Sequence, residues 1–341
     1  MKMKITILPI MSIFIIFALL LYSVPISADK SSYIKMNTPF TVDPNQQGYA
    51  LEPGTTIHQL ANGETQVYGP DAKLKFKARD SESRVISRPN GQEVKANHIY
   101  LIPSDCQVIR KGDITYISKN NKNILTLIID KKSKSYFPPF DGYIEQAYDW
   151  SVVNLTYFTG NWNAPTRPSD WQGSQYYYLW NGIHSTSGQG LMQPVLEWNY
   201  GSTHAWTGAA WYVVSDSDWL RATPVSVSVG QQCRGTMTYT QGTDSWLITF
   251  RNVSAGTTSD IVVIGFSYQN VAVIVAMEGY EVFNDADVGG DCTFSNLSGT
   301  YLGNPVLFNW TELVNSSVPL TGLRVDGAYY GSSTIVLNTA N

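Results

Sequence analysis

The feature that most constrains the fold is a succession of short, strand-like runs separated by residues that favour turns. Residues 55–60 alternate in polarity, and residues 124–129 are almost entirely apolar. Turn-forming pairs such as Asn62-Gly63 and Lys111-Gly112 stand between runs of this kind, as they do in hairpins. The apolar spacing of an amphipathic helix is absent from residues 53–130. The pattern predicts an all-β chain.

Beyond Trp150 the runs become longer, and no repeat period links them. Many antiparallel strands in one segment bury their apolar faces when two sheets pack against each other. We therefore predict an antiparallel β-sandwich or jelly roll. The candidate strands are residues 152–158, 175–180, 191–199, 209–214, 224–229, 235–240, 245–252, 261–268, 271–282 and 333–337.

The N-terminus has the layout of a secretory signal. Lys2 and Lys4 precede an apolar run over residues 5–22, and small residues follow up to Ala28. We interpret residues 1–28 as a signal peptide cleaved after Ala28, which predicts a secreted protein without membrane contact after cleavage. An uncleaved membrane anchor is the alternative, because the apolar run is long for a signal.

Composition divides the rest of the chain in two. The last lysine is Lys134, and all ten tryptophans lie at or after Trp150. Residues 151–341 hold five arginines and thirteen acids, a net charge of −8, whereas residues 29–150 hold sixteen basic and fourteen acidic residues, a net charge of +2. We therefore predict a small β-rich N-terminal domain or prosegment at residues 29–135 and the β-sandwich at residues 150–341.

The opposite net charges of these two segments favour their association at neutral pH. Protonation of the carboxylates in acid weakens that attraction, as expected of a detachable prosegment, and an ordinary accessory domain is the open alternative. The lysines at 131, 132 and 134, followed by Pro138-Pro139, predict a linker that proteases can reach.

Cysteines and sequons fit an exported chain. Cys233 and Cys292 lie in the same half of the chain and can pair, whereas Cys106 stands alone. There is no CxxC motif, so a zinc site built from thiolates is not expected. Five sequons are candidate glycan sites: Asn154, Asn252, Asn296, Asn309 and Asn315.

The common catalytic motifs are missing. The sequence has no GxSxG, no HExxH and no glycine-rich phosphate loop, and the acidic C-terminal half lacks the basic face that nucleic acids require. Serine, zinc and phosphoryl-transfer chemistry are therefore disfavoured, and we expect neither a metal nor a cofactor. Carboxylates and amides remain as candidate catalytic groups.

A glutamate ends the most apolar run of the C-terminal half. Residues 271–277 are all apolar, and Glu278 follows directly. A carboxylate beside buried surface is costly unless it is paired, hydrogen-bonded or used. A strand end that emerges into solvent would leave Glu278 exposed, whereas alternation along a strand suggests the floor of a cleft. The residues that share its face are Ala272, Ile274, Ala276 and Tyr280.

An amide interrupts a second apolar run at Gln193. Alternation places it on one face with Leu191, Val195 and Glu197, and a buried amide needs hydrogen-bond partners, so a structural glutamine is one interpretation. Pro194 predicts an edge strand or a bulge, and bulges often redirect side chains near sites. The aromatic residues 176–180 line either a binding groove or the core.

Five stretches, in order along the chain, resemble the glutamic peptidases, or eqolisins. The resemblance covers roughly residues 150–285. It implies a secreted, pepstatin-insensitive acid endopeptidase with a prosegment, built on a concanavalin-like antiparallel β-sandwich. The stretches are Tyr157–Pro165, Leu179–Ile183, Leu191–Trp198, Ala210–Tyr212 and Met277–Glu281.

The resemblance also implies roles for single residues. Gln193 and Glu278 match the catalytic glutamine and glutamate of the family. Two positions depart from it, since Val213 stands where the family has an acid and His184 where it has an aspartate; both bear on pH optimum and substrate preference. The residues expected to bind substrate are Trp180, Glu197, Tyr280 and Trp211.

In the implied reaction Glu278 takes a proton from a water that it holds together with Gln193, and the amide of Gln193 stabilises the oxyanion. The expected partners are polypeptide substrates, and we expect a monomer. Two other functions stay open: a non-catalytic binding or adhesion module, and a glycoside hydrolase that uses Glu197 and Glu278 as its two carboxylates.

Overall fold

The structure is a computed structural model that describes residues 34–36, 49–82, 85–87, 93–130, 143–187, 190–214 and 218–341. The predicted signal peptide at residues 1–28 and the predicted linker at residues 131–139 lie outside the described residues. Contacts group residues 33–341 into one compact unit, to which every element below belongs.

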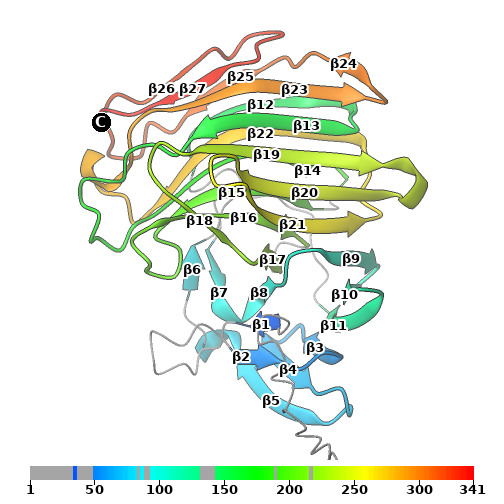
Figure 1. The fold of residues 1–341 in the computed structure, drawn as a ribbon. Coiled ribbons are helices and arrows are strands. Elements are labelled where there is room, and N and C mark those ends of the chain that lie inside the picture. Colours follow the sequence, from blue (N-terminus) through cyan, green and yellow to red (C-terminus); the bar gives the residue numbers. More distant parts are fainter. Residues whose placement is uncertain are drawn as a thin grey trace, which may run out of the picture. The chain divides into compact units, whose positions relative to one another are not determined.

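The all-β prediction is confirmed, because two large sheets pack face to face as a β-sandwich (Figure 1). A two-stranded ribbon of β6 (Val85–Ser87) and β7 (Glu93–Lys95) stands apart from them. No helix in the described part of the chain has the length and apolar character to cross a membrane. The short 3₁₀ helices are η2 (Asp80–Glu82), η3 (Ala96–His98), η4 (Gln241–Thr243) and η5 (Asp285–Asp287).

The first sheet has eleven strands within the described residues. Its order is β2 (Tyr49–Leu51), β1 (Ile34–Met36), β8 (Ile99–Ile102), β17 (Trp219–Ala222), β16 (Trp206–Val213), β15 (Leu191–Trp198), β14 (Tyr176–Ser185), β22 (Gln269–Tyr280), β12 (Tyr143–Asn154) and β25 (Thr311–Val314), with β18 (Val225–Val227) also paired to β16.

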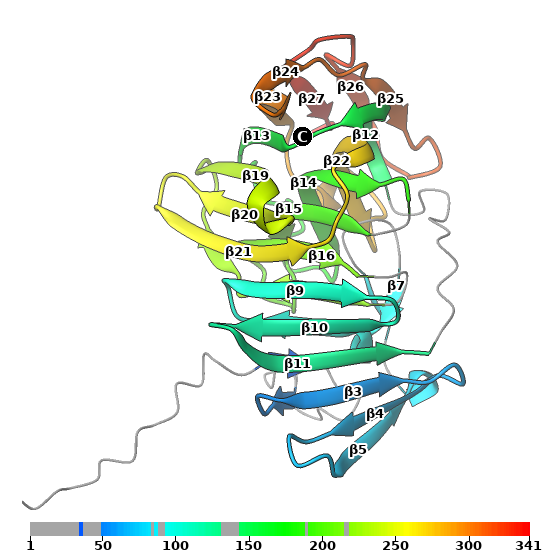
Figure 2. The same ribbon diagram turned by 90° about the vertical axis from the view of Figure 1, so that its right-hand side faces the viewer.

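The second sheet has fourteen strands within the described residues, and Figure 2 shows its run from β21 to β5. Its order is β26 (Arg324–Asp326), β27 (Ile335–Asn338), β23 (Cys292–Tyr301), β13 (Tyr157–Asn163), β19 (Gln232–Thr240), β20 (Ser245–Asn252), β21 (Thr257–Ile264), β9 (Cys106–Lys111), β10 (Ile114–Lys119), β11 (Lys122–Ile129), β3 (Thr55–Gln59), β4 (Glu64–Tyr68) and β5 (Leu74–Arg79), with β24 (Asn304–Val306) also paired to β23.

Both faces of the first sheet are apolar. Side chains alternate between the faces of a strand, so Tyr177 and Leu179 of β14 join the main core between the sheets. Tyr178 and Trp180 of the same strand join a second buried cluster, drawn from strands of the first sheet alone. We call the side that carries this second cluster the outer face. Its other buried members are Ile99, Tyr143, Leu191, Val195, Ala209, Trp211, Val213, Trp219, Ile274 and Ala276.

Two parallel pairings join the N-terminal strands to the sandwich. β8 runs parallel to β17 in the first sheet, and β9 runs parallel to β21 in the second. Both sheets therefore continue from the sandwich into the segment predicted as a separate domain or prosegment (Figures 1 and 2). The first strand of the sandwich, β12, begins at Tyr143. The division of the chain into functional units stays a prediction.

Pro194 lies in an inner strand, so the edge strand predicted from it is wrong. β15 has β14 on one side and β16 on the other, and its register with both is regular, without a bulge. The pairing with β14 stops after Trp180–Val195 and resumes at Ile183–Met192. Proline has no N–H to donate, and the sheet tolerates this as a short gap in the ladder.

The sequence patterns also misplaced some strands. The predicted strand 152–158 is two strands, because β12 ends at Asn154 and β13 begins at Tyr157. Between them Leu155 is fully buried in the core, so its apolar character reflects a buried turn. β23 was not predicted at all, because its serines, asparagine and glycine mask the alternation of its buried residues.

All three cysteines have free, buried thiols, so the possible bond between Cys233 and Cys292 is not formed. The two cysteines lie on β19 and β23, which β13 separates. Of the five sequons, Asn252 is fully buried, and its amide nitrogen donates to the Ser226 carbonyl and to Gln231. A glycan would attach to that nitrogen, which is buried and already donates two hydrogen bonds, so this sequon is not accessible for glycosylation in the folded chain.

Close packing between the sheets gives a first prediction. A Cβ added at Gly208 of β16 would lie 1.8 Å from Cε1 of the buried Phe250 on the second sheet. We expect Gly208→Ala to lower the free energy of unfolding by about 1–3 kcal/mol through overpacking, measured by urea denaturation. Gly242→Ala, where a new Cβ meets nothing within 4 Å, is the control. Equal stability of the two variants would contradict this packing.

Candidate active site

The predicted catalytic residues lie on the outer face of three neighbouring strands, in the order β15, β14, β22. Tyr178 of β14 pairs with Glu197 of β15 on one side and with Glu278 of β22 on the other. Residues paired across strands share a face. The register therefore places both glutamates in one row of the outer face, with Tyr178 between them.

Gln193 lies on the same face, two rows away. It pairs with Trp211 of β16, and the pairs on either side of the ladder gap put it opposite Gly182 of β14. Gln193 and Glu278 are thus two strands apart, about 10 Å across the sheet, and four residues apart along it, about 13 Å. Trp180 stands at the midpoint of the diagonal that joins them.

Burial of the two predicted catalytic side chains is complete. Gln193 and Glu278 both have 0% exposure, so Glu278 does not sit at a solvated strand end. Neither the amide oxygen nor the amide nitrogen of Gln193 has a hydrogen-bond partner, and the indole nitrogen of Trp180 lacks one as well. A structural glutamine at this depth would be hydrogen-bonded, so these groups are candidates for contact with a ligand.

Tyr143 is the nearest neighbour of Glu278 on the opposite side. It pairs with Glu278 from β12, and its hydroxyl hydrogen-bonds to the Glu278 carboxylate. Burial raises the pKa of Tyr143 well above its ordinary value, and the charge of Glu278 raises it further. The phenol therefore stays protonated and serves as a donor. Its ring lies 6.1 Å from that of Trp180.

The other glutamate, Glu197, is fully engaged by protein groups. Arg221 of β17 donates from Nε to Oε1 at 2.9 Å and from Nη2 to Oε2 at 2.6 Å. Trp211 Nε1 donates to Oε1 at 2.5 Å, and Thr207 Oγ1 donates to Oε2 at 2.8 Å. Four donors fill this carboxylate, which is 0% exposed. The glycoside hydrolase hypothesis needs Glu197 as a reacting carboxyl group, and these contacts disfavour it.

Aromatic rings hold the Arg221 guanidinium in place. Its carbon lies 4.2 Å from the ring centre of Tyr200 and 5.7 Å from that of Trp211. Such stacking adds to the bidentate ion pair. Trp211, which we expected to bind substrate, therefore supports the Glu197–Arg221 pair in this structure. Tyr280, another expected substrate contact, is half-buried and meets Tyr178 edge-on at 6.0 Å.

The two positions that depart from the family pattern lie on the outer face one row beyond Gln193. His184 of β14 and Val213 of β16 both pair with Leu191 of β15. Burial lowers the pKa of His184 to about 4, and its ring meets Trp150 edge-on at 5.3 Å. Above about pH 4 these two positions therefore carry no charge, where the family pattern would have two acids.

Sequence reasoning missed Arg221 and Tyr143. Arg221 is a single charge within the four buried residues of β17, and an arginine inside an apolar run was a signal that some carboxylate must pair with it. Tyr143 offered no signal, since its role depends on the register between β12 and β22. In the described residues, no group of three or more His, Cys, Asp or Glu side chains is placed to hold a metal ion.

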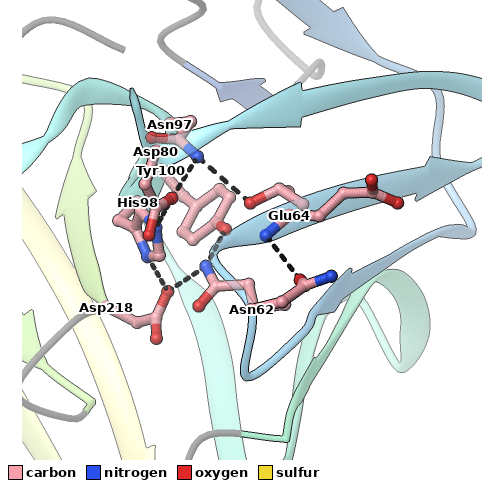
Figure 3. A network of polar contacts seen from close by, with 9 residues as sticks. Asn62, Glu64, Asp80, Asn97, His98, Tyr100 and Asp218 are labelled. Atoms are coloured by element: carbon pink, nitrogen blue, oxygen red, sulfur yellow. Dashed lines mark hydrogen bonds and ion pairs between the residues drawn. The ribbon is translucent and has the colours of Figure 1, made fainter. Parts of the chain in front are cut away.

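A second buried polar network joins the N-terminal strands to the sandwich (Figure 3). His98, at the end of η3, lies between Asp80 Oδ1 at 2.8 Å from Nε2 and Asp218 Oδ1 at 3.4 Å from Nδ1. Gln59 donates to Asp218 and, at 2.7 Å, to the Tyr100 hydroxyl. Asp218 immediately precedes β17, so the network lies where β8 meets the sandwich.

The His98 network is built around a charged imidazole. Burial lowers the pKa of His98, but the hydrogen bonds and charges of Asp218 and Asp80 outweigh this effect and raise the pKa to about 9. At neutral pH His98 is therefore a cation between two carboxylates. Asn97 completes the network by donating to Thr65 at 3.1 Å and to Asp80 at 3.2 Å.

Comparison with models of known protein families gives no match, and neither does comparison with curated protein sequences. Several solved structures are similar. Scytalido-glutamic peptidase with a peptide-based transition-state analogue has a TM-score of 0.42 and 15% identity, over 58% of this chain and 98% of that one. SCP-B, an eqolisin in complex with the tripeptide Ala-Ile-His, has a TM-score of 0.42 and 16% identity over the same shares. Toad ovary galectin with thio-digalactose has a TM-score of 0.27 and 10% identity, over 40% and 98%.

The buried ion pair gives a second prediction. Arg221→Met leaves the Glu197 carboxylate buried without its cation, and we expect it to lower the free energy of unfolding by about 3–5 kcal/mol. The double variant Glu197→Gln, Arg221→Met removes the unpaired buried carboxylate as well, and it should recover much of the lost unfolding free energy. Urea denaturation of both variants measures the difference. A single variant as stable as the double variant would contradict the assigned pairing.

The His98 network gives a third prediction. Because the folded pKa is raised from 6.5 to about 9, protonated His98 stabilises the fold fully below about pH 6.5, and that contribution, about 3 kcal/mol, is lost as pH rises through about 9. We expect unfolding free energies measured from pH 6 to pH 10 to fall in the wild type and to fall less in His98→Gln. His58→Gln, on the half-exposed β3, is the control. The same slope in all three proteins would contradict the prediction.

Proposed function

We propose that this chain is a secreted endopeptidase of the glutamic type, which hydrolyses peptide bonds at acid pH with Glu278 and Gln193. The observation that carries the proposal is the register of the first sheet. It sets the carboxylate and the unpartnered amide on one buried face, diagonally across the unpartnered indole of Trp180. The sequence resemblance had assigned these same residues to catalysis and to substrate binding.

The chemistry follows from the two groups. An ionised Glu278 takes a proton from a water bound at its carboxylate, and the water oxygen attacks the carbonyl carbon of a peptide that lies across Trp180 towards Gln193. Gln193 donates its amide N–H to the developing oxyanion, a contribution of about 3–4 kcal/mol for one such donor. Glu278 then passes the proton to the leaving nitrogen. Trp180, between the two groups, supports the peptide that spans them.

The groups that surround Glu278 include a phenol and a neutral amide. Tyr143 donates a hydrogen bond to the Glu278 carboxylate, and Arg221 is already paired with Glu197. The second functional group, Gln193, is neutral, so no second carboxylate opposes ionisation of Glu278 as it would in a paired-acid site. In the proposed reaction Glu278 is therefore the single carboxylate that serves first as base and then as acid.

Access to the site requires a movement of the chain. Both functional side chains are fully buried, and a polypeptide reaches them when the covering residues move. Ile99, which belongs to the segment predicted as a prosegment, packs in the same apolar cluster as Trp180. We infer that the full-length chain is a latent form and that cleavage or release of the N-terminal segment opens the outer face.

A digestion assay tests the proposal. Acid-denatured haemoglobin is incubated at pH 3–5 with the purified chain, before and after limited proteolysis, with and without pepstatin. We expect pepstatin-resistant cleavage that increases after proteolysis. Glu278→Gln should abolish it, and Gln193→Ala should lower kcat about 10²–10³-fold.

The matched control is Glu281→Gln, the same substitution three residues away at an exposed position, which should leave activity unchanged. Cleavage by Glu278→Gln at the wild-type rate, or no cleavage by the wild type in either state, would refute the proposed function. The latter result would favour the binding-module alternative.

A further inference from the structure

A third functional group borders the candidate active site on β12. Gln146 pairs with Ala276 of β22, and Ala276 belongs to the cluster on the outer face. Because paired residues share a face, the side chain of Gln146 lies on the same face as Glu278. It is 0% exposed, and neither its amide oxygen nor its amide nitrogen has a hydrogen-bond partner.

The position of Gln146 mirrors that of Trp180. Both residues pair with Ala276, from β12 and from β14, so the three form one row. Glu278 stands in the next row, two residues along β22. Gln146 is therefore a diagonal neighbour of Glu278, at about 7–8 Å between Cα atoms. The two other members of this group of four are Ala276 of β22 and Tyr143 of β12.

Other buried amides of this chain are hydrogen-bonded. Gln59 donates to Tyr100 and Asp218, and Asn97 donates to Thr65 and Asp80. Among the buried amide side chains of the described residues, Gln146 and Gln193 are those without a partner at both polar atoms. Both lie on the outer face, within two rows of Glu278. Two unpartnered amides on one face of the sheet offer donors and acceptors that the fold leaves unused.

A carboxamide carries a donor and an acceptor side by side, which matches the C=O and N–H of one peptide unit. We propose that Gln146 binds the main chain of the polypeptide substrate on the β12 side of Glu278, opposite Gln193. The carboxylate then acts between two amides, one that holds the substrate backbone and one that stabilises the oxyanion. This inference rests on the proposed function and adds a substrate-contacting residue to it.

The surroundings of Gln146 fit a bound peptide. On its other side it pairs with Leu313 of the edge strand β25, which is 37% exposed. The outer face therefore passes from a buried carboxylate through a buried amide to a partly solvent-exposed apolar residue over three strands. A peptide lying in this direction contacts the amide with its main chain and Leu313 with a side chain.

Steady-state kinetics on oxidised insulin B chain test the assignment, with every variant used after limited proteolysis here and in the binding measurement below. Gln146→Met keeps the length of the side chain but removes both polar atoms, and we expect kcat/KM to fall about tenfold while the unfolding midpoint stays at or above the wild-type value. Gln146→Glu places a second carboxylate diagonal to Glu278. The acid limb of its pH profile should therefore move to higher pH by about one unit, because like charges oppose ionisation. Gln269→Met, at an exposed position on β22, is the control and should match the wild type.

A binding measurement makes the test independent of turnover. Calorimetric titration of oxidised insulin B chain into Glu278→Gln should show binding that weakens about tenfold when Gln146→Met is added. Unchanged kinetics, pH profile and binding in the Gln146 variants, with activity abolished in Glu278→Gln, would overturn this inference and leave the proposed function intact. Wild-type activity in Glu278→Gln would overturn the proposed function and this inference together.

Discussion

Burial of the first sheet on both faces is the constraint on which the rest of the structure depends. Every residue of β15 is buried, and β22 is buried from Val271 to Glu278. Alternation then divides each strand between two apolar clusters, Val275 and Met277 in the main core and Ile274 and Ala276 on the outer face. An acid that ends such a run meets no water on either face. Glu278 is thus kept among aromatic rings and amides, where its charge is expensive unless it is used.

β17 connects the site to the N-terminal strands. Arg221 of this strand forms an ion pair with Glu197 on the outer face. Asp218, the residue immediately before the strand begins, contacts His98 of the N-terminal segment. The pairing of β17 with β8 fixes both contacts in one element. A change in the His98 network therefore acts on the strand that supports the Glu197–Arg221 pair. In the proposed latent form, this connection is a second route by which the N-terminal segment would influence the site.

The sequence predicts local features well and long-range register poorly. Counting alternate residues along the strand was enough to group Glu278 with Ile274 and Ala276 on one face, although it left open whether Glu278 is exposed. The turn pairs were enough to predict an all-β chain. Pro194 led to the wrong prediction of an edge strand. The pairing between β14 and β15 is interrupted over two residues there, and an inner strand tolerates this gap. The partners of Arg221 and the position of Gln146 follow from which strands lie side by side, which short-range patterns do not encode. Short-range patterns likewise do not encode the parallel pairings of β8 with β17 and of β9 with β21.

In the proposed function, neutral amides on the face of the carboxylate would let a dry face also be reactive. A buried cation near Glu278 would hold it as an inert ion pair, as Arg221 holds Glu197. A second carboxylate would keep one of the two acids protonated. Amides do neither, yet each offers a donor to an oxyanion and an acceptor to a peptide N–H. In the proposed function, two unpartnered glutamines on the face of one glutamate neither pair with its charge nor compete for its proton, and a bound peptide would supply the polar contacts that the two amides lack.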